Sequence, residues 1–397
     1  MRRTPLGWYN LLHDRTRSLV AIAGVAFALT AIFMQSGFLQ SVLRTATIVT
    51  DKLDYDLVII SDNYLYLAEP GSFPRPYIDR ARAIPGVRAV VPISIFTSTW
   101  RNPERRPGTD EATWEQQQQR RPVLVIGFDL ADHPFRSQDS FRAGEVEAAR
   151  DRLKEADTVL VDRRSRREYG PLEVGLRPEI GLRRRKVVGL FSMGTGFAAD
   201  GAIIVGEQTF AGIAGRDRLA RPNLGLVQLD PDADPDAVAR RLAALLLPAI
   251  DVKVMTRAAF RASEQWYWVA GKSLGVIFLI GVSVAFLVGV VVVYQVLSSD
   301  IADHLAEYAT LKAMGYTAGR LATIVLQQGL IIAAAAYVPA LAVSWLLYLE
   351  VERRAMIPIA MHPWIAGPLL VAAAIMCSTS AVVSLRTVRQ ADPADMY

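Results

Sequence analysis

Four long stretches of this sequence contain no Lys, Arg, Asp or Glu. They are Ser18–Leu43, Ser273–Ser299, Leu321–Leu349 and Ala355–Leu385, with 26, 27, 29 and 31 residues respectively. An α-helix needs about 20 mostly apolar residues to cross about 30 Å of hydrocarbon, so each stretch is long enough to span a membrane. Aromatic residues near the ends of the stretches are typical of the membrane interface; they are Trp8, Tyr9, Trp266, Tyr267, Trp268, Trp345, Tyr348 and Trp364. We therefore expect four transmembrane helices, at residues 18–43, 272–299, 321–349 and 364–385.

The composition agrees with a membrane protein and argues against a nucleic-acid-binding one. Charged residues make up 21% of the chain, below the roughly 25% of soluble domains. The net charge is +5, but residues 45–271 contain 32 of the 44 Lys and Arg and 31 of the 39 Asp and Glu. Because the two signs nearly balance there, the charge distribution does not indicate a nucleic-acid partner. The single cysteine, Cys377, excludes an intrachain disulfide and a multi-cysteine metal site.

Arginines at both ends of the chain predict its orientation in the membrane. Arg2, Arg3, Arg15 and Arg17 precede the first span, and Arg386 and Arg389 follow the last. Because Lys and Arg favour the cytoplasmic side, we expect both termini, the loop 300–320 and the tail 386–397 in the cytoplasm. Residues 44–271 and the short loop 350–363 then lie in the periplasm. The first span exceeds the roughly 7–15 apolar residues of a signal peptide and has no clear cleavage site, so we interpret it as a retained anchor.

The segment 44–271 alternates strand and helix patterns at both of its ends. Strands are expected at 56–60, 87–97, 224–229 and 252–255, and a short helix at 76–84. A second helix is expected after Asp234, with Val238, Leu242 and Leu245 on one face. These units predict an α+β lobe from 45–100 and 221–260, with a mostly β sub-lobe at 101–220. The predicted fold class is thus a membrane α-helical protein with four transmembrane helices and a large α+β periplasmic domain between helices 1 and 2.

Several short patterns resemble catalytic or ligand-binding motifs but lack essential residues. Gly271-Lys-Ser273 ends like a phosphate-binding loop, but Trp266 stands where its first glycine belongs. Gly194–Ala199 resembles a dinucleotide-binding turn without the acidic residue and helix that should follow. The four histidines, His13, His133, His304 and His362, show no metal-ligand spacing. We therefore predict no catalytic, cofactor-binding or metal-binding residue. Arg183–Lys186 is interpreted as a solvated strand start, with an anionic partner surface as the alternative.

The predicted spans contain no residue suited to ion coupling. Proton- and ion-coupled transporters usually place ionisable side chains within the membrane, and these four stretches have no Asp, Glu, Lys or Arg. Gly281, Ala285 and Gly289 recur every four residues in the second span. Such a stripe of small residues predicts close helix packing, either within the subunit or across a dimer. An energy source other than an ion gradient is expected.

The cytoplasmic segment 303–315 has the composition of a helix. Leu305, Ala309 and Lys312 share one face, and Gly315 is well placed to end the helix. Asp303 and Glu307 are like charges at i and i+4, which destabilises a helix by roughly 0.2–0.5 kcal/mol. We interpret the segment as presenting acidic side chains to a basic partner. A short connecting helix that lies on the membrane is the alternative.

The residues His304–Tyr316 resemble the loop after the second span in FtsX/MacB-type ABC permeases, most closely those of the DevC branch. Further matches lie at 157–162, 187–191, 196–201 and 391–397. The resemblance implies a dimeric permease subunit with a separate ABC-type ATPase, which binds the ATP, because this chain has no fused nucleotide-binding domain. It also implies a periplasmic membrane-fusion adaptor, an outer-membrane channel and export of a glycolipid-like cargo.

The same resemblance assigns roles to residues by position. The family's amphipathic N-terminal helix corresponds to residues 1–17, and its coupling helix to about Asp303–Met314. The implied ATPase-coupling residues are Asp303, Glu307, Tyr308, Leu311, Lys312 and Gly315. Our leading hypothesis is a non-catalytic permease subunit that transmits ATP-driven motion and so exports a lipidic or amphipathic cargo. The alternatives are an FtsX-like regulator of a periplasmic enzyme, such as a cell-wall hydrolase, and an adhesion or receptor protein without an ATPase.

Overall fold

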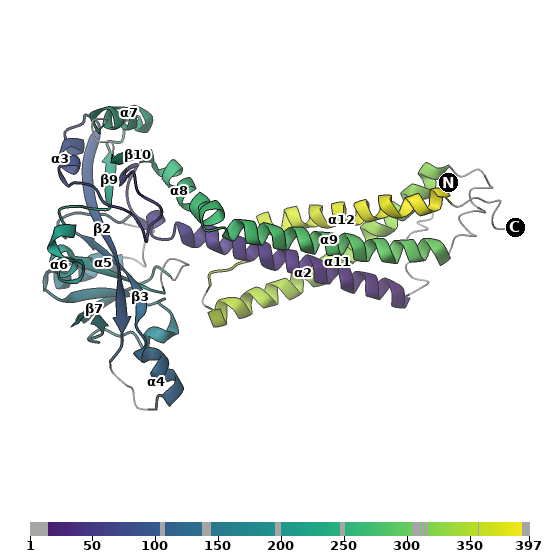
Figure 1. The fold of residues 1–397 in the computed structure, drawn as a ribbon, viewed down its shortest axis with the longest axis horizontal. Helices are drawn as coiled ribbons and strands as arrows, with labels where there is room; N and C mark the ends of the chain where they lie inside the picture. Colours follow the sequence, from purple (N-terminus) through teal and green to yellow (C-terminus); the bar gives the residue numbers. More distant parts are fainter. Residues whose placement is uncertain are drawn as a thin grey trace. The chain divides into compact units, whose positions relative to one another are not determined.

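The computed structural model describes residues 15–103, 108–136, 144–194, 200–246, 251–303, 310, 314, 317–355 and 357–390. The chain divides into two compact units. Residues 42–272 form one, hereafter the inserted domain, and residues 1–41 with 273–397 form the other, the helical unit. Figure 1 draws both units, with labels on the long helices and on several of the strands. The predicted N-terminal helix at 1–17 lies almost wholly outside the described residues.

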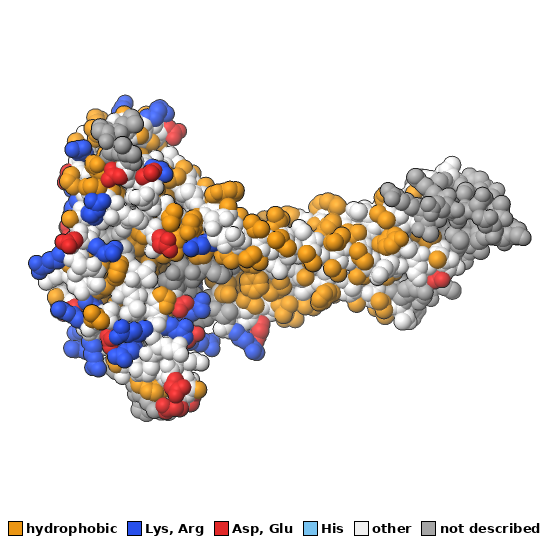
Figure 2. All heavy atoms as spheres, viewed as in Figure 1, with side chains coloured by type: hydrophobic (Ala, Val, Ile, Leu, Met, Phe, Trp, Pro, Cys, Tyr) orange, Lys and Arg blue, Asp and Glu red, His pale blue; other side chains and the backbone are white. Residues whose placement is uncertain are grey.

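Long apolar helices build the helical unit. They are α2 (Arg15–Ala46), α9 (Leu274–Asp303), α11 (Ala318–Ala355) and α12 (Pro363–Gln390). Among the described residues, four helical segments are long and apolar enough to cross a membrane: Ser18–Ala46, Leu274–Asp303, Ala322–Arg354 and Pro363–Ser384. Figure 2 shows hydrophobic side chains over the outer surface of this unit. Leu279 and Leu287 of α9, for example, are exposed. Because so large an apolar surface is unusual in water, the hydrocarbon of a membrane is its expected surrounding.

Uncharged groups make the hydrogen bonds between these helices. Tyr337 Oη donates to the carbonyl oxygen of Ala366 over 2.7 Å, and Ser380 Oγ donates to that of Val290 over 2.8 Å. The Tyr348 hydroxyl donates to the carbonyl oxygen of Phe33. Helices in lipid associate through close packing and such interhelical hydrogen bonds, since lipid supplies no hydrophobic driving force between them.

A mixed sheet runs through the described part of the inserted domain, with the strand order β10-β1-β9-β2-β3-β8-β4-β7; β5 pairs with β2 and with β6. The strands are β1 (Leu57–Ser61), β2 (Val87–Arg101), β3 (Arg121–Phe128), β4 (Thr158–Asp162), β5 (Glu179–Ile180), β6 (Arg183–Arg184), β7 (Lys186–Phe191), β8 (Ala202–Gly206), β9 (Leu224–Leu229) and β10 (Val252–Thr256). The helices are α3 (Pro76–Arg82), α4 (Glu111–Gln118), α5 (Glu145–Ala149), α6 (Glu207–Ala214), α7 (Pro235–Leu246) and α8 (Arg257–Trp266).

The long strand β2 joins the two predicted lobes into one sheet. Its first half pairs with β9 as far as Ile93, and its second half pairs with β3 from Ile93 to Trp100, both antiparallel. At one end of the sheet β1 pairs antiparallel with β10, with Leu57 opposite Thr256. The beginning and the end of the inserted domain therefore lie on neighbouring strands.

Two layers of helices and loops cover the sheet around β1 and β9. On one face α3 and α7 pack Ile78, Val238 and Leu242 against the strands. On the other face one cluster extends from Phe260 of α8 to β3, β4 and β8. The start of α7 is as predicted, with Pro235 following Asp234, but its buried face ends at Leu246, and Leu245 is 42% exposed. The predicted fold class, four membrane helices with an α+β domain between the first and second, is confirmed.

Candidate functional site

The predicted ATPase-coupling residues lie almost entirely outside the described residues. Asp303 is the exception: it ends α9, and its side chain is exposed. Nearby, the amide of Met314 donates to the carbonyl oxygen of Thr310 over 3.0 Å, a bond with α-helical spacing. Glu307, Tyr308, Leu311, Lys312 and Gly315 are not among the described residues. Their coupling role stays a prediction.

The predicted small-residue stripe of α9 faces other helices of the same subunit. A Cβ atom added at Gly289 would lie 2.2 Å from Sδ of Met376 on α12 and 3.1 Å from Cβ of Ala28 on α2. One added at Gly281 would lie 2.7 Å from the side-chain amide of Gln35 on α2. Ala285, between them, is 8% exposed. The stripe thus allows α9 to approach α2 and α12 closely.

Side-chain contacts hold together the first and the last segments of the inserted domain. Nε2 of Gln265 donates to the carbonyl oxygen of Leu43 over 3.4 Å, which joins α8 to the last turns of α2. Arg257 Nη2 donates to the carbonyl oxygen of Asp51 over 3.1 Å. Arg261 Nη1 lies 3.4 Å from Asp51 Oδ1. We call this region the junction, comprising residues 43–55, 62–70 and 257–271.

Helix α8 contributes two buried side chains to the junction. Its N-cap is Thr256, whose hydroxyl accepts a hydrogen bond from the amide of Ala259 over 3.3 Å. Phe260 and Glu264, four residues apart, are its buried positions, with exposed fractions of 0% and 1%. Since residues at i and i+4 lie on the same face of a helix, α8 presents one apolar and one acidic side chain to the core.

Glu264 is a buried carboxylate with two hydrogen-bond donors. Its Oε1 accepts from the hydroxyl of Tyr64 over 2.7 Å, and its Oε2 accepts from the amide of Leu67 over 3.3 Å. Burial raises the pKa of Glu264 to about 7, although both hydrogen bonds favour the charged form and lower it. The two bonds join α8 to the loop 62–70.

Aromatic rings attach the same loop to the end of the domain. The Tyr66 ring stacks on that of Tyr267 with centroids 4.8 Å apart, and Trp268 meets Tyr66 edge-on at 5.5 Å. Nζ of Lys272 lies 5.2 Å from the centroid of the Tyr66 ring. Such aromatic pairs contribute about 0.5–1.5 kcal/mol each beyond their buried area. Tyr267 and Trp268 belong to a π-helical turn, Tyr267–Gly271, which follows α8 directly.

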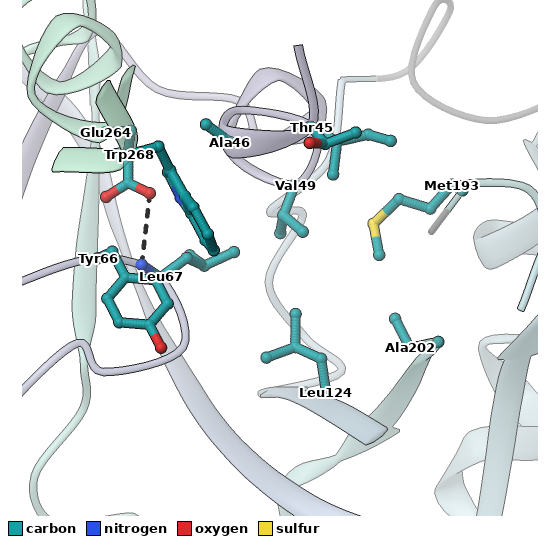
Figure 3. Close-up of a pocket in the computed structure, with 13 residues that line it drawn as sticks. Thr45, Ala46, Val49, Tyr66, Leu67, Leu124, Met193, Ala202, Glu264 and Trp268 are labelled. Atoms are coloured by element: carbon teal, nitrogen blue, oxygen red, sulfur yellow. Dashed lines mark hydrogen bonds between the residues drawn. The ribbon is translucent and has the colours of Figure 1, made fainter. Parts of the chain in front are cut away.

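A small cavity of about 30 Å³ lies at the centre of the junction. Figure 3 shows its wall: Thr45, Ala46 and Val49 come from the end of α2 and the turn after it, Leu67 and Trp268 lie beside Glu264, and Leu124, Met193 and Ala202 close the opposite side. Roughly 10–15 Å³ of such space is enough to hold one water molecule. The cavity therefore suits water, and it is far too small for a lipid.

The described residues contain no group of three or more His, Cys, Asp or Glu that could hold a metal ion. What the arrangement offers is mechanical connection. The junction ties the residues that follow the first span to those that precede the second, through Asp51, Glu264 and Gln265.

Sequence reasoning missed the junction residues. Glu264 lies four residues after Phe260 and two residues before the aromatic run Trp266–Trp268, a spacing that places an acidic residue on an apolar helix face. That signal was available in the sequence. The partners of Glu264 and Gln265 lie about 200 residues away, with sequence separations of 200, 197 and 222. No local pattern indicates contacts over such separations.

Comparisons with known proteins match both parts of the chain. A family model described as the MacB-like periplasmic core domain matches residues 18–245, and one described as the FtsX-like permease C-terminal matches residues 276–393. The chain is similar to the extracellular domain of the noncanonic ABC-type transporter YknZ from Gram-positive bacteria, with 17% identity over 52% of this chain and 98% of that one and a TM-score of 0.32. It is similar to the periplasmic region of MacB from Actinobacillus actinomycetemcomitans, with 12% identity over 54% of this chain and 94% of that one and a TM-score of 0.36. A search of curated proteins gave no match.

Substituting Gly289 tests the close approach of α9 to α12. Gly289→Ala places a methyl group against Met376, which is fully buried and has little room to move. We expect destabilisation of about 1–3 kcal/mol, seen as a lower midpoint of thermal unfolding in detergent. The control, Gly281→Ala, meets only the flexible end of the Gln35 side chain and should leave the midpoint nearly unchanged. Equal effects of the two substitutions would contradict the packing described.

The buried carboxyl of Glu264 predicts a pH dependence of stability. Its pKa rises from the ordinary value of 4.5 to about 7 on folding, so the folded state holds the proton to higher pH. Well below pH 4.5 both the folded and the unfolded state hold the proton, and burying the neutral carboxyl removes no charge from water. As the pH rises from 4.5 to 7 the stability falls, by about 3 kcal/mol in total, and above pH 7 the loss is complete.

We expect Glu264→Gln to remove this fall in stability between pH 4.5 and pH 7, because glutamine does not ionise. The measurement is the midpoint of thermal unfolding at pH 5 and at pH 8. The exposed Glu69 in the same loop gives a matched control, Glu69→Gln, which should keep the wild-type difference between the two pH values. If Glu264→Gln also kept it, Glu264 would not be the group that titrates.

Proposed function

Because the chain belongs to the MacB/FtsX-like family of ABC transporter permeases, we propose that it transmits ATP-driven movement of its membrane helices to its periplasmic domain. Membership of this family and the four apolar helices make it a multi-pass protein of the inner membrane. The family implies an ABC-type ATPase as its partner. A permease subunit of this kind is generally non-catalytic, and ATP hydrolysis takes place in the partner.

The junction is the observation that supports transmission. The inserted domain connects to the membrane helices through only two stretches of chain, the end of α2 and the segment after α8. Helix α8, which leads into the second stretch, is bound to the end of α2 through Gln265 and Leu43 and to the turn that follows α2 through Arg257, Arg261 and Asp51. A displacement of either stretch therefore moves the other and the strands β1 and β10, which pair beside them.

The membrane helices support a movement driven by ATP rather than by an ion gradient. Their charge-free stretches contain no carboxylate, lysine or arginine to serve as a coupling site. The contacts between them are close packing at Gly289 and hydrogen bonds of uncharged groups such as Tyr337. Energy then has to enter from outside the bilayer, and the exposed Asp303 marks where α9 leaves its apolar segment for the predicted coupling residues.

Within this function we propose export of a lipidic or amphipathic, glycolipid-like cargo by a homodimer. A periplasmic membrane-fusion adaptor and an outer-membrane channel complete the proposed complex. The support is the resemblance of residues 304–316 to the DevC branch of the family. The junction cavity of about 30 Å³ is too small for such a cargo, so in this proposal the cargo moves outside the junction and the domain acts on it or on the adaptor by changing position.

An FtsX-like regulatory role is the second candidate, and the FtsX-like match over 276–393 favours it as much as export. The same junction would then pass the movement to a periplasmic enzyme such as a cell-wall hydrolase. Deletion of the gene separates the two candidates. Export predicts a changed lipid composition of the envelope with normal septation, and regulation predicts altered septation or wall turnover with normal lipids.

Two substitutions in the predicted coupling helix test the ATPase connection. Glu307→Lys reverses a charge that we expect to meet a basic surface, and Leu311→Asp places a charge in an apolar contact. We expect each to reduce co-purification of the ATPase and its stimulated ATP turnover by about tenfold or more, equivalent to about 1.4 kcal/mol of binding. The control is Met314→Leu at an exposed position of the same segment, which should change neither quantity. Unchanged association and turnover in both variants would show that coupling lies elsewhere.

A further inference from the structure

The central strand β2 has an open edge along part of its length. On one side it pairs with β3 without a break from Ile93 to Trp100. On the other side the pairing with β9 ends at Ile93, and the pairing with β5 begins at Trp100. Between these two points, no strand in the described part of the domain pairs with β2 on that side. Residues 94–99 therefore form a strand with one free edge in the middle of the sheet.

The alternation of an antiparallel ladder determines which main-chain groups point toward this edge. Successive residues direct their N–H and C=O groups to opposite neighbours. The carbonyl oxygens of Ile93 and Thr99 accept from the amides of Asn223 and Gly181, over 2.9 and 2.8 Å, so odd-numbered residues face the open edge.

The amide of Ile95 is already bonded, since it donates to Oδ1 of Asn223 over 2.6 Å. Four groups remain for a further strand: the C=O of Ile95, the N–H and C=O of Thr97, and the N–H of Thr99. Thr97, at the centre, is exposed.

A groove follows the open edge on the surface of the domain. One part, of about 660 Å³, is lined by Ile95, Phe96 and Thr97 together with residues of 63–72 and 217–223. The other part, of about 520 Å³, is lined by Phe96–Thr99 and by Gly181 and Leu182 of the turn between β5 and β6. The two parts share Phe96 and Thr97. The groove is therefore continuous past Thr97.

Arginines surround this groove and give it a positive charge. Arg218 and Arg221 line it, and the exposed Arg183, Arg184 and Arg216 adjoin its lining residues Leu182 and Asp217 in the sequence. None of these five is in an ion pair that the described residues show, whereas Arg120, which also lines the groove, lies 3.0 Å from Glu179 Oε1. The guanidinium of Arg218 lies over the Phe96 ring, 4.7 Å from its centroid. The acidic residues that line the groove are Asp217 and Glu69, and the Tyr66 hydroxyl donates to Glu69 over 3.2 Å. A ligand with several carboxylates would complement the excess of arginine.

We propose that the open edge of β2 binds an extended acidic segment of a partner protein, which adds to the sheet as a short strand between β9 and β5. Strand addition uses main-chain hydrogen bonds for affinity and side chains for selectivity. Here Ile95, Thr97 and Thr99 offer the main-chain bonds, and the arginines select acidic side chains. The inference goes beyond the proposed function, and it requires only that the inserted domain lies outside the cytoplasm, whether the chain serves export or regulation.

The binding test uses the full chain in lipid nanodiscs and an array of fluorescein-labelled heptapeptides. In the array Asp or Glu alternates with Val, Ile or Thr, and a matched array carries Lys or Arg instead. We expect acidic peptides to bind and basic ones not to. N-methylation of alternate peptide residues removes ladder donors and should abolish binding. Arg218→Glu with Arg221→Glu should weaken it about tenfold, since two exposed ion pairs contribute up to about 1 kcal/mol each.

Substitution at Thr97 tests the ladder itself. Thr97→Pro removes the central N–H donor and should abolish binding, while Thr97→Val keeps both main-chain groups and should bind like the wild type. Proline at an unpaired edge position is compatible with a sheet. Hydrogen exchange on the unsubstituted chain gives a second readout. We expect the amides of Thr97 and Thr99 to exchange fast in the free chain and to be protected by the acidic peptide, while those of Phe96 and Ser98, on the β3 side, stay protected throughout.

Three results would overturn the proposal. If the amides of Thr97 and Thr99 exchanged in the free chain as slowly as those of Phe96 and Ser98, the edge would already be covered. Equal binding of acidic and basic peptides would remove the role of the arginines. If no peptide of the array bound, the arginines would instead serve to keep other strands away from the edge, as charged residues do on many exposed strands. None of these results bears on ATPase association, which tests the proposed function separately.

Discussion

The pairing of β1 with β10 is the constraint on which the inserted domain depends. It places Leu57 opposite Thr256 and so brings together segments about 200 residues apart. Closing so long a loop costs conformational entropy, and local structure does not offset that cost. The compensation comes from burial around the pair, where Phe260 of α8 packs with Val58 and Ile60 of β1. Once the strands are paired, the end of α2 and the start of α8 have to lie beside each other, and the contacts of Asp51 and Gln265 follow.

Glu264 shows that the junction is not built for stability alone. Its side chain is 1% exposed, and burying a carboxylate costs free energy because the group loses its hydration. The carboxylate fixes the geometry of the contact, because its two oxygens accept hydrogen bonds from Tyr64 and Leu67 at defined positions. The loop 62–70 is thereby held against α8, and the stacked rings of Tyr66 and Tyr267 hold its other side. This arrangement suits a connection that has to pass a displacement without deforming.

The sequence predicted those features that depend on local composition. The four membrane helices follow from stretches without charge, and the start of α7 follows from Asp234 and Pro235, because hydrocarbon and helix capping act on neighbouring residues. Family membership was also predictable, since the residues 304–316 resemble the FtsX/MacB-type permeases and the family models match both parts of the chain. Assignment to the DevC branch stays a prediction.

Features that depend on distant pairing could not be predicted in this way. The two lobes expected at 45–100 with 221–260 and at 101–220 share one sheet, because β2 continues from β9 to β3. An apolar run in the sequence indicated part of the length of β2, but nothing in that run indicated that β2 pairs with β9 and β3. The open edge at Thr97 results from where β9 ends and β5 begins, and the burial of Glu264 results from contacts about 200 residues away. Register and pairing over such distances leave no periodic pattern in the sequence.

The central claim is that the end of α2 and the inserted domain move as one body while ATP is hydrolysed. Pulsed electron paramagnetic resonance between spin labels at Arg44, exposed near the end of α2, and Arg240, exposed on α7, measures this directly. Cys377, the only cysteine of the chain, is replaced by serine. The account predicts one narrow distance distribution that is the same without ATP and during turnover with the partner ATPase. A distribution that shifts by more than its own width, or splits in two, when ATP is added would contradict it.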